Sequence, residues 1–163
     1  MKQIRLIASD LDGTLLPFGT NEVSEEIFDL IREIRSRGIY FFMASGRQFY
    51  QIRNMFKAVA DSIGFICENG CLGIFNGEII CREFMDQNLC DEILRDIMKF
   101  EDCEFHVSGA DGYYVQPKRR SFYDELIAAG VKVNLVENIF KHPEPYMKLS
   151  IHKPHGFSEN DVT

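Results

Sequence analysis

The chain has 163 residues, of which 45% are apolar and 26% charged, and its formal net charge is -7. This composition supports a buried core and excludes wholesale disorder, and the negative charge argues against nucleic-acid binding by bulk electrostatics. No apolar run approaches the roughly 20 residues that span a bilayer. The N-terminal residues also lack the apolar stretch of a signal peptide, so we expect a cytoplasmic protein without a membrane or nucleic-acid partner.

The first half of the chain alternates short apolar segments with segments of helical periodicity. We predict strands over residues 4–9, 39–43 and 64–67, and helices over 25–37 and 48–60. Ser24 is a favourable N-cap for the first helix, and Gly38 is a favourable residue just past its end. The apolar character of the first strand is typical of a strand buried on both faces. The alternation predicts an α/β fold with a parallel sheet and right-handed crossovers.

The pattern changes after the third strand. Asn76-Gly77 lies between apolar segments at 72–75 and 78–81, which predicts a β-hairpin. Further on we predict helices over 91–100 and 122–129 and strands over 104–107, 113–116 and 146–152. This second half is therefore expected to be α+β, with mixed or antiparallel strands. We place the boundary between the two parts near residues 82–85.

Polar residues follow each of the first three predicted strands, at the edge where open α/β sheets bind ligands. They are Asp10, Asp12 and Thr14, then Ser45, Gly46 and Arg47, then Glu68 and Asn69. Two carboxylates directly after an apolar strand are costly unless a cation compensates them, and Mg²⁺ accepts oxygen ligands while leaving room for a phosphate. A carboxylate there can attack phosphorus, and the second can protonate the leaving group and then activate water. The alternative interpretations are ordinary turns and a helix cap followed by a surface arginine.

The segment Asp10-Leu11-Asp12-Gly13-Thr14-Leu15-Leu16, together with Ala44-Ser45-Gly46-Arg47, resembles the haloacid-dehalogenase-like (HAD) phosphatase superfamily. More narrowly it resembles the Cof-type branch, which inserts an α+β cap after the third core strand. The resemblance implies a Rossmann-like core over residues 1–82 and part of a cap over 83–163. It also implies a Mg²⁺-dependent phosphatase for small phosphorylated metabolites such as sugar phosphates, acting through an aspartyl-phosphate.

The same resemblance implies roles for individual residues. Asp10 is the expected nucleophile and Asp12 the expected general acid/base, and both are expected to bind Mg²⁺, Asp12 through its backbone carbonyl. The residues expected around the phosphate are Leu11, Thr14, Ser45, Gly46, Arg47 and Asn69.

Two later motifs of the superfamily, a lysine and an acidic pair within Gly-Asp-x-x-Asn-Asp, are not recognised before Thr163. Residues 156–161 contain the Gly and the Asn-Asp, but Phe157 stands where the principal aspartate belongs, so we interpret them as a loop. We therefore expect a chain that ends inside the cap, is incomplete for catalysis and can associate with itself through its incomplete core.

Three explanations fit this incomplete core: a fragment of a longer protein, a truncated gene product, or a chain completed by a partner. A non-catalytic phosphate- or Mg²⁺-binding or interaction module is the alternative function, and a receiver-like signalling domain a weaker one.

Overall fold

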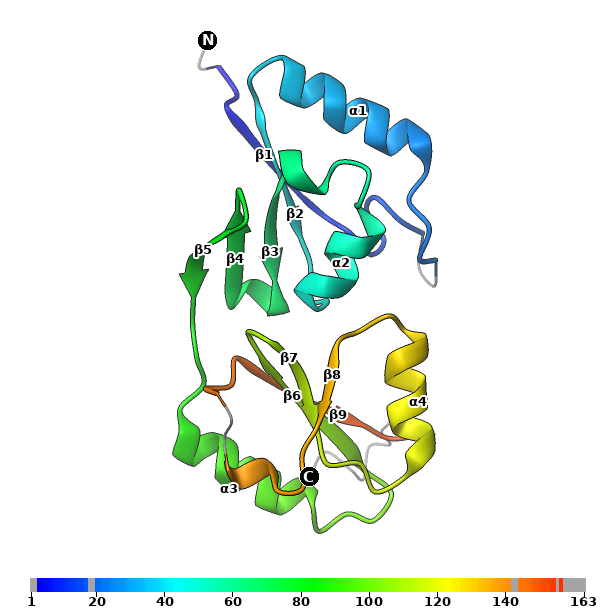
Figure 1. Ribbon diagram of the computed structural model, residues 1–163, viewed down its shortest axis with the longest axis vertical. Coiled ribbons are helices and arrows are strands. Elements are labelled where there is room, and N and C mark those ends of the chain that lie inside the picture. The colour runs from blue at the N-terminus through cyan, green and yellow to red at the C-terminus, as the bar shows by residue number, and fades with distance from the viewer. Residues whose placement is uncertain (1–2, 18–19, 142–143, 155, 157–163) are drawn as a thin grey trace. The chain divides into compact units, whose positions relative to one another are not determined.

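The computed structural model describes residues 3–17, 20–141, 144–154 and 156, and the chain divides into two compact units, Met1–Glu83 and Phe84–Thr163 (Figure 1). The strands are β1 (Leu6–Asp10), β2 (Tyr40–Ala44), β3 (Gly64–Cys67), β4 (Leu72–Phe75), β5 (Glu78–Arg82), β6 (Glu104–Gly109), β7 (Gly112–Val115), β8 (Val133–Leu135) and β9 (Lys148–His152). The helices are α1 (Glu25–Ser36), α2 (Phe49–Met55), α3 (Gln87–Ile97) and α4 (Arg120–Ala128), with short 3₁₀ turns at Ala60–Ser62, Glu68–Gly70 and Ile139–Lys141.

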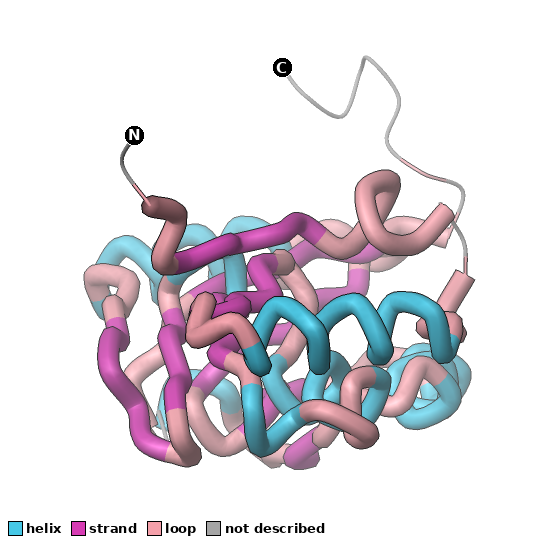
Figure 2. Tube along the Cα trace, turned by 90° about the horizontal axis from the view of Figure 1, so that it is seen from above, coloured by secondary structure: helices cyan, strands magenta, loops and turns pink. Residues whose placement is uncertain are grey.

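Unit Met1–Glu83 contains a five-stranded sheet in the order β1-β2-β3-β4-β5. The first three strands are parallel, and β4 and β5 continue the sheet as an antiparallel hairpin. Figure 2 distinguishes these strands from the helices by colour. The predicted α/β fold with a parallel sheet is confirmed.

The core of this unit forms because β2 is apolar on both faces and is flanked by two strands. Phe41, Phe42 and Met43 are all buried. A Cβ atom on Gly64 would lie 2.2 Å from the Phe42 ring, so β3 needs glycine where it passes that ring. Helix α1 contributes Phe28, whose ring meets Phe56 edge to face at 6.1 Å.

Two expectations for this unit were wrong in detail. Strand β1 is not buried on both faces: in the described sheet it pairs with β2 alone, and Leu6 is 52% exposed. Helix α2 ends at Met55 rather than near residue 60. The chain tightens after Phe56, where Val59 N–H donates to the Phe56 carbonyl at 2.9 Å, and this turn directs the chain back into β3 while Phe56 and Val59 stay buried.

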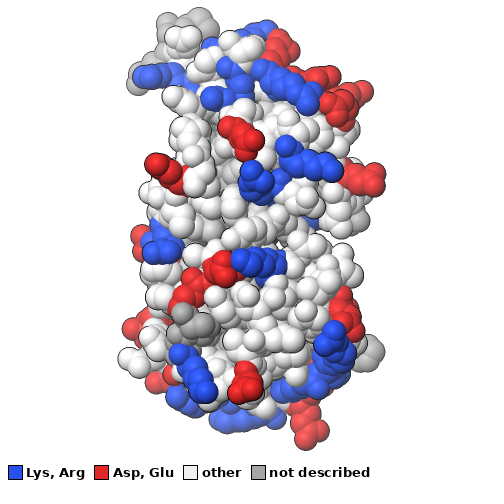
Figure 3. Space-filling model, viewed as in Figure 1, with Lys and Arg blue, Asp and Glu red and all other residues white. Residues whose placement is uncertain are grey.

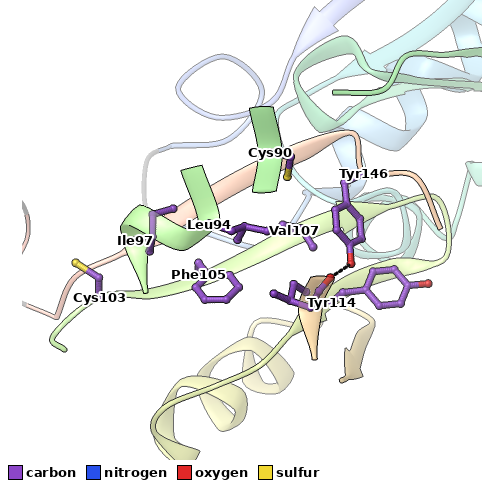
Figure 4. Close-up of a cluster of buried hydrophobic side chains, with 9 residues drawn as sticks. Cys90, Leu94, Ile97, Cys103, Phe105, Val107, Tyr114 and Tyr146 are labelled. Carbon is purple, nitrogen blue, oxygen red and sulfur yellow. Dashed lines mark hydrogen bonds between the residues drawn. The ribbon is translucent and has the colours of Figure 1, made fainter. Parts of the chain in front are cut away.

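Unit Phe84–Thr163 contains a four-stranded sheet in the order β8-β7-β6-β9. Strand β6 is antiparallel to both β7 and β9, whereas β7 and β8 are parallel, so the predicted α+β pattern with mixed strands is observed. One buried cluster joins α3 to the sheet through Leu94, Phe105 and Tyr114 (Figure 4). A second cluster contains Tyr113 and α4. Because neighbouring residues of a strand point to opposite faces, α3 and α4 cover opposite faces of this sheet.

Three features of this unit were not anticipated. Strand β8 is only three residues long, too short to show a period, and was not predicted. Helix α3 begins four residues before the predicted start, because Asp86 acts as its N-cap and accepts a hydrogen bond from Leu89 N–H at 2.9 Å. Tyr146 donates a hydrogen bond to the Ile139 carbonyl at 2.9 Å within the first cluster (Figure 4). Residues 157–161, part of the segment interpreted as a loop, lie outside the described residues.

The described part of the chain contains no helix that is both long and apolar enough to span a bilayer. On the face drawn in Figure 3, acidic and basic side chains are interspersed. The net charge of -7 is therefore not collected into one acidic surface on that face.

Candidate active site

The carboxyl ends of β1, β2 and β3 lie side by side in unit Met1–Glu83. Asp10 is in register with Ala44, and Ala44 is in register with Ile66. The loops that follow are joined by backbone hydrogen bonds: Ser45 N–H donates to the Ile66 carbonyl at 2.9 Å, and Glu68 N–H donates to the Arg47 carbonyl at 3.3 Å. The three predicted polar clusters therefore meet at one edge of the sheet.

The loop after β1 is built around the buried side chain of Leu11. The Leu11 carbonyl accepts hydrogen bonds from the N–H groups of Thr14, Leu15 and Leu16 at 3.3, 3.0 and 2.9 Å. Gly13 has a φ of 79°, a value that favours glycine, and its N–H donates to the Leu16 carbonyl. This compact loop leaves Asp10 exposed, with a long hydrogen bond of 3.4 Å from Thr14 Oγ1 to its Oδ2. The Asp10 carboxylate is thus open to a ligand.

Asp12 is held by Arg47 from the loop after β2. Arg47 Nη2 lies 2.6 Å from Asp12 Oδ1, and Arg47 Nε lies 3.0 Å from Oδ2, which makes the pair bidentate. The Arg47 side chain is 20% exposed and that of Asp12 34% exposed. The remaining guanidinium nitrogen, Nη1, donates to Asn21 Oδ1 at 2.7 Å and lies 3.5 Å from Met55 Sδ. The two loops are therefore joined by charged, directional contacts.

The turn after β3 has an unusual backbone. Glu68 and Asn69 adopt φ values of 53° and 57°, in the left-handed region that non-glycine residues seldom occupy. Such conformations cost on the order of 1–3 kcal/mol each and cluster at functional sites. The strained turn brings Asn69 against Gly46, where an added Cβ would lie 2.3 Å from Asn69 Oδ1. Glycine at 46 is needed for this close approach.

The structure also limits what some of the predicted residues can do. The side chain of Leu11 is fully buried, so only its backbone could contact a phosphate. Ser45 is 8% exposed, and its Oγ accepts a hydrogen bond from Arg47 N–H at 3.2 Å. Sequence reasoning missed Asn21, which lies in an ordinary polar loop before α1 and carries no recognisable signal. Met55 of α2 also contacts Arg47, through its sulfur.

The donor atoms at this edge fit part of a Mg²⁺ coordination sphere. Mg²⁺ in phosphate-binding sites is commonly held by one or two carboxylates, with waters and substrate oxygens completing the octahedron. Asp10 supplies an exposed carboxylate, whereas the Asp12 carboxylate is engaged by Arg47. Among the described residues no group of three or more His, Cys, Asp or Glu side chains is arranged to hold a metal ion. A cation here would depend on Asp10, backbone carbonyls, water and the substrate.

The sequence matches the family model described as haloacid dehalogenase-like hydrolase over residues 7–160. The chain therefore belongs to the haloacid dehalogenase-like hydrolase family. Among curated proteins it is 27% identical to 5-amino-6-(5-phospho-D-ribitylamino)uracil phosphatase from Escherichia coli, over 76% of this chain and 44% of that protein. It is 31% identical to phosphoglycolate phosphatase 1 from Saccharolobus solfataricus, over 83% of this chain and 63% of that protein.

Solved structures share the fold. A haloacid dehalogenase-like hydrolase from B. subtilis matches with a TM-score of 0.73 at 20% identity, over 90% of this chain and 60% of that one. A subclass IIB sugar phosphatase of the superfamily matches with a TM-score of 0.68 at 18% identity, over 89% of this chain and 57% of that one. The chain spans between 44% and 63% of the length of the two curated relatives named above.

Proposed function

We propose that this chain supplies the nucleophile and the general acid/base of a phosphatase that hydrolyses phosphate monoesters. The observation that carries the proposal is the pairing of an exposed Asp10 carboxylate with an Asp12 carboxylate held in place by Arg47. Nucleophile and acid/base thus lie on one loop, two residues apart. Membership of a hydrolase family whose curated relatives are phosphatases supports this reaction class.

The proposed chemistry has two steps. In the first, an Asp10 carboxylate oxygen attacks phosphorus, the bond from phosphorus to the ester oxygen breaks, and Asp12 gives its proton to that oxygen. In the second, water attacks the phosphorus of the aspartyl-phosphate, Asp12 accepts a proton from the water, and Asp10 leaves with its carboxylate restored. The products are an alcohol and inorganic phosphate.

We further propose Mg²⁺ as the cofactor, held by the Asp10 carboxylate and the Asp12 backbone carbonyl. When bound, the ion offsets the charge of two anions that otherwise repel one another. The residues proposed around the phosphoryl group are Thr14 and Ser45, with Gly46 and Asn69 lining the neighbouring turn. The curated relatives are named for small phosphorylated metabolites, so we propose a substrate of that class.

The test is the hydrolysis of p-nitrophenyl phosphate by the wild-type protein and by Asp10→Asn, with and without excess EDTA. Mg²⁺-dependent turnover by the wild type that falls to background in Asp10→Asn, because an amide is a poor nucleophile toward phosphorus, would support the assignment and would show that the expected catalytic incompleteness is wrong. Mass spectrometry of acid-quenched wild-type protein should show one added phosphoryl group on the peptide that contains Asp10.

Equal turnover by both proteins would overturn the assignment of Asp10. Phosphate binding that depends on Mg²⁺, without turnover or phosphoryl transfer, would instead support the non-catalytic module. Circular dichroism of Asp10→Asn serves as the folding control, and we expect no loss of structure because the side chain is exposed.

Gly46→Ala should reduce activity by about tenfold or more while the fold remains intact. The new Cβ would lie 2.3 Å from Asn69 Oδ1 and would displace that side chain from the turn. Because Asn69 is exposed, we expect the free energy of unfolding to change by less than about 1 kcal/mol, as judged by urea titration. If the close approach is the cause, adding Gly46→Ala to Asn69→Ala should cost no further activity. An equally large further loss would contradict this explanation.

A further inference from the structure

Each of the three guanidinium nitrogens of Arg47 contacts a protein group. Nε and Nη2 contact the two oxygens of Asp12, and Nη1 contacts Asn21 Oδ1. A free arginine side chain has many rotamers, and three directional contacts restrict it to one. The family resemblance implies that this guanidinium lies around the phosphate, and its observed partners favour a different role.

We propose that Arg47 is a positioning residue for the acid/base Asp12, and that Asn21 orients Arg47; this inference rests on the proposed function. A bidentate pair fixes the plane of the carboxylate as well as its position. Within the described residues Arg47 is the cation that pairs with Asp12, so the arginine could not swing toward a phosphate without releasing it. In the observed pair both Asp12 oxygens accept from Arg47, so Asp12 carries the proton it donates when one of these two contacts opens while the other keeps the side chain in place; that side chain is 34% exposed.

This role makes a prediction about leaving groups that a phosphate-binding role does not. Proton donation matters most when the departing oxygen is basic, as in an alkyl phosphate, and little for p-nitrophenolate. If Arg47 positions the proton donor, its loss penalises alkyl esters selectively. If Arg47 binds the phosphoryl group, its loss penalises both ester types alike.

The experiment compares wild-type protein with Arg47→Met on glycerol phosphate and on p-nitrophenyl phosphate. We expect kcat/KM, which reports the transfer of the phosphoryl group to Asp10 and not the later hydrolysis that both esters share, to fall about 10- to 100-fold for glycerol phosphate and less than about threefold for the aryl ester. Asn21→Ala should act in the same direction with a smaller effect. Arg47→Lys keeps the charge but not the bidentate geometry and should restore part of the lost rate.

Arg53→Met is the matched control because Arg53 also belongs to the α2 region and pairs at its surface with Asp61 at 3.0 Å. It should leave both substrates unaffected. An equal loss of kcat/KM on both esters in Arg47→Met, or a rise in KM alone, would overturn the positioning role.

A second readout does not depend on activity. Three-bond ¹³C couplings measured by NMR report the χ1 angle of Asp12 in the wild type and in Arg47→Met. We expect one fixed rotamer in the wild type and averaged couplings in the variant, with Arg53→Met resembling the wild type. Unchanged couplings in Arg47→Met would refute the proposal even in an active enzyme. A wild type that fixes Asp12 but does not hydrolyse either ester would refute the proposed function and leave the positioning contact supported.

Discussion

Glu104→Ala is expected to destabilise unit Phe84–Thr163 by about 3 kcal/mol, because it removes a buried carboxylate that accepts three hydrogen bonds at once. Glu104 is 1% exposed at the start of β6. Its Oε2 accepts from Lys118 N–H at 3.0 Å, and its Oε1 accepts from Arg119 N–H at 2.9 Å and from Arg119 Nε at 3.2 Å. Arg119 is the N-cap residue of α4 but makes no side-chain capping bond. The Glu104 carboxylate of β6 instead accepts the hydrogen bond from the backbone N–H at the start of this helix.

Urea titration followed by tyrosine fluorescence measures this effect, since the chain contains six tyrosines and no tryptophan. Glu104→Gln retains one acceptor oxygen and should lose about half as much. Glu101→Ala is the matched control three residues away, and because Glu101 is exposed it should change the free energy of unfolding by less than about 0.5 kcal/mol. Equal effects of Glu104→Ala and Glu101→Ala would show that the buried network contributes nothing.

Most of the parallel half of the fold could be predicted because local signals and long-range packing agree there. The strand of Tyr40–Ala44 is apolar at successive positions, and its flanking helices carry apolar stripes. Ser24 is the N-cap residue of α1 as predicted, although its side chain makes no capping hydrogen bond. The exposure of β1 was missed because an apolar run cannot reveal how many neighbours a strand has in the described sheet. The length of α2 was missed because no glycine or proline marks its end, and the tightening after Phe56 comes from tertiary packing.

For the candidate site, spacing along the chain located the three loops but could not predict their contacts. Strand ends in register explain why Asp10, Ser45 and Asn69 come to one edge. The partners of Arg47 depend on the direction of its side chain, which the sequence pattern does not give. Asn21 lies 26 residues from Arg47, so the hydrogen bond between them could not be predicted from local periodicity. Glu104 is a comparable case in the other unit, since its donors lie 14 and 15 residues further along the chain.

Lowering the pH from 7 to 5 should destabilise unit Phe84–Thr163 by about 2 kcal/mol through His106 alone. Burial lowers the pKa of His106 from 6.5 to about 3, and the neighbouring His152 and Lys148 act in the same direction. At pH values between 3 and 6.5 the imidazole of residue 106 is protonated in the unfolded chain but stays neutral in the folded chain. Stability is therefore fully retained above pH 6.5 and is lost as the pH falls toward 3, at about 1.4 kcal/mol per pH unit.

The geometry explains why His106 stays neutral. Its ring stacks on Tyr113 with centroids 3.9 Å apart, and its Nδ1 lies 3.0 Å from His152 Nε2. Proton uptake would place a charge in this apolar layer without a carboxylate in direct contact among its described partners.

His106→Gln removes the titrating ring, so the free energy of unfolding should vary less steeply with pH, whatever its value at pH 7. Because the burial of His152 is only partial, His152→Gln should flatten the profile less. Hydrogen exchange of the β6 amides between pH 5 and 7, corrected for intrinsic rates, assigns the effect to this unit. If the free energy of unfolding changes with pH equally in His106→Gln and in the wild type, His106 is excluded as its source.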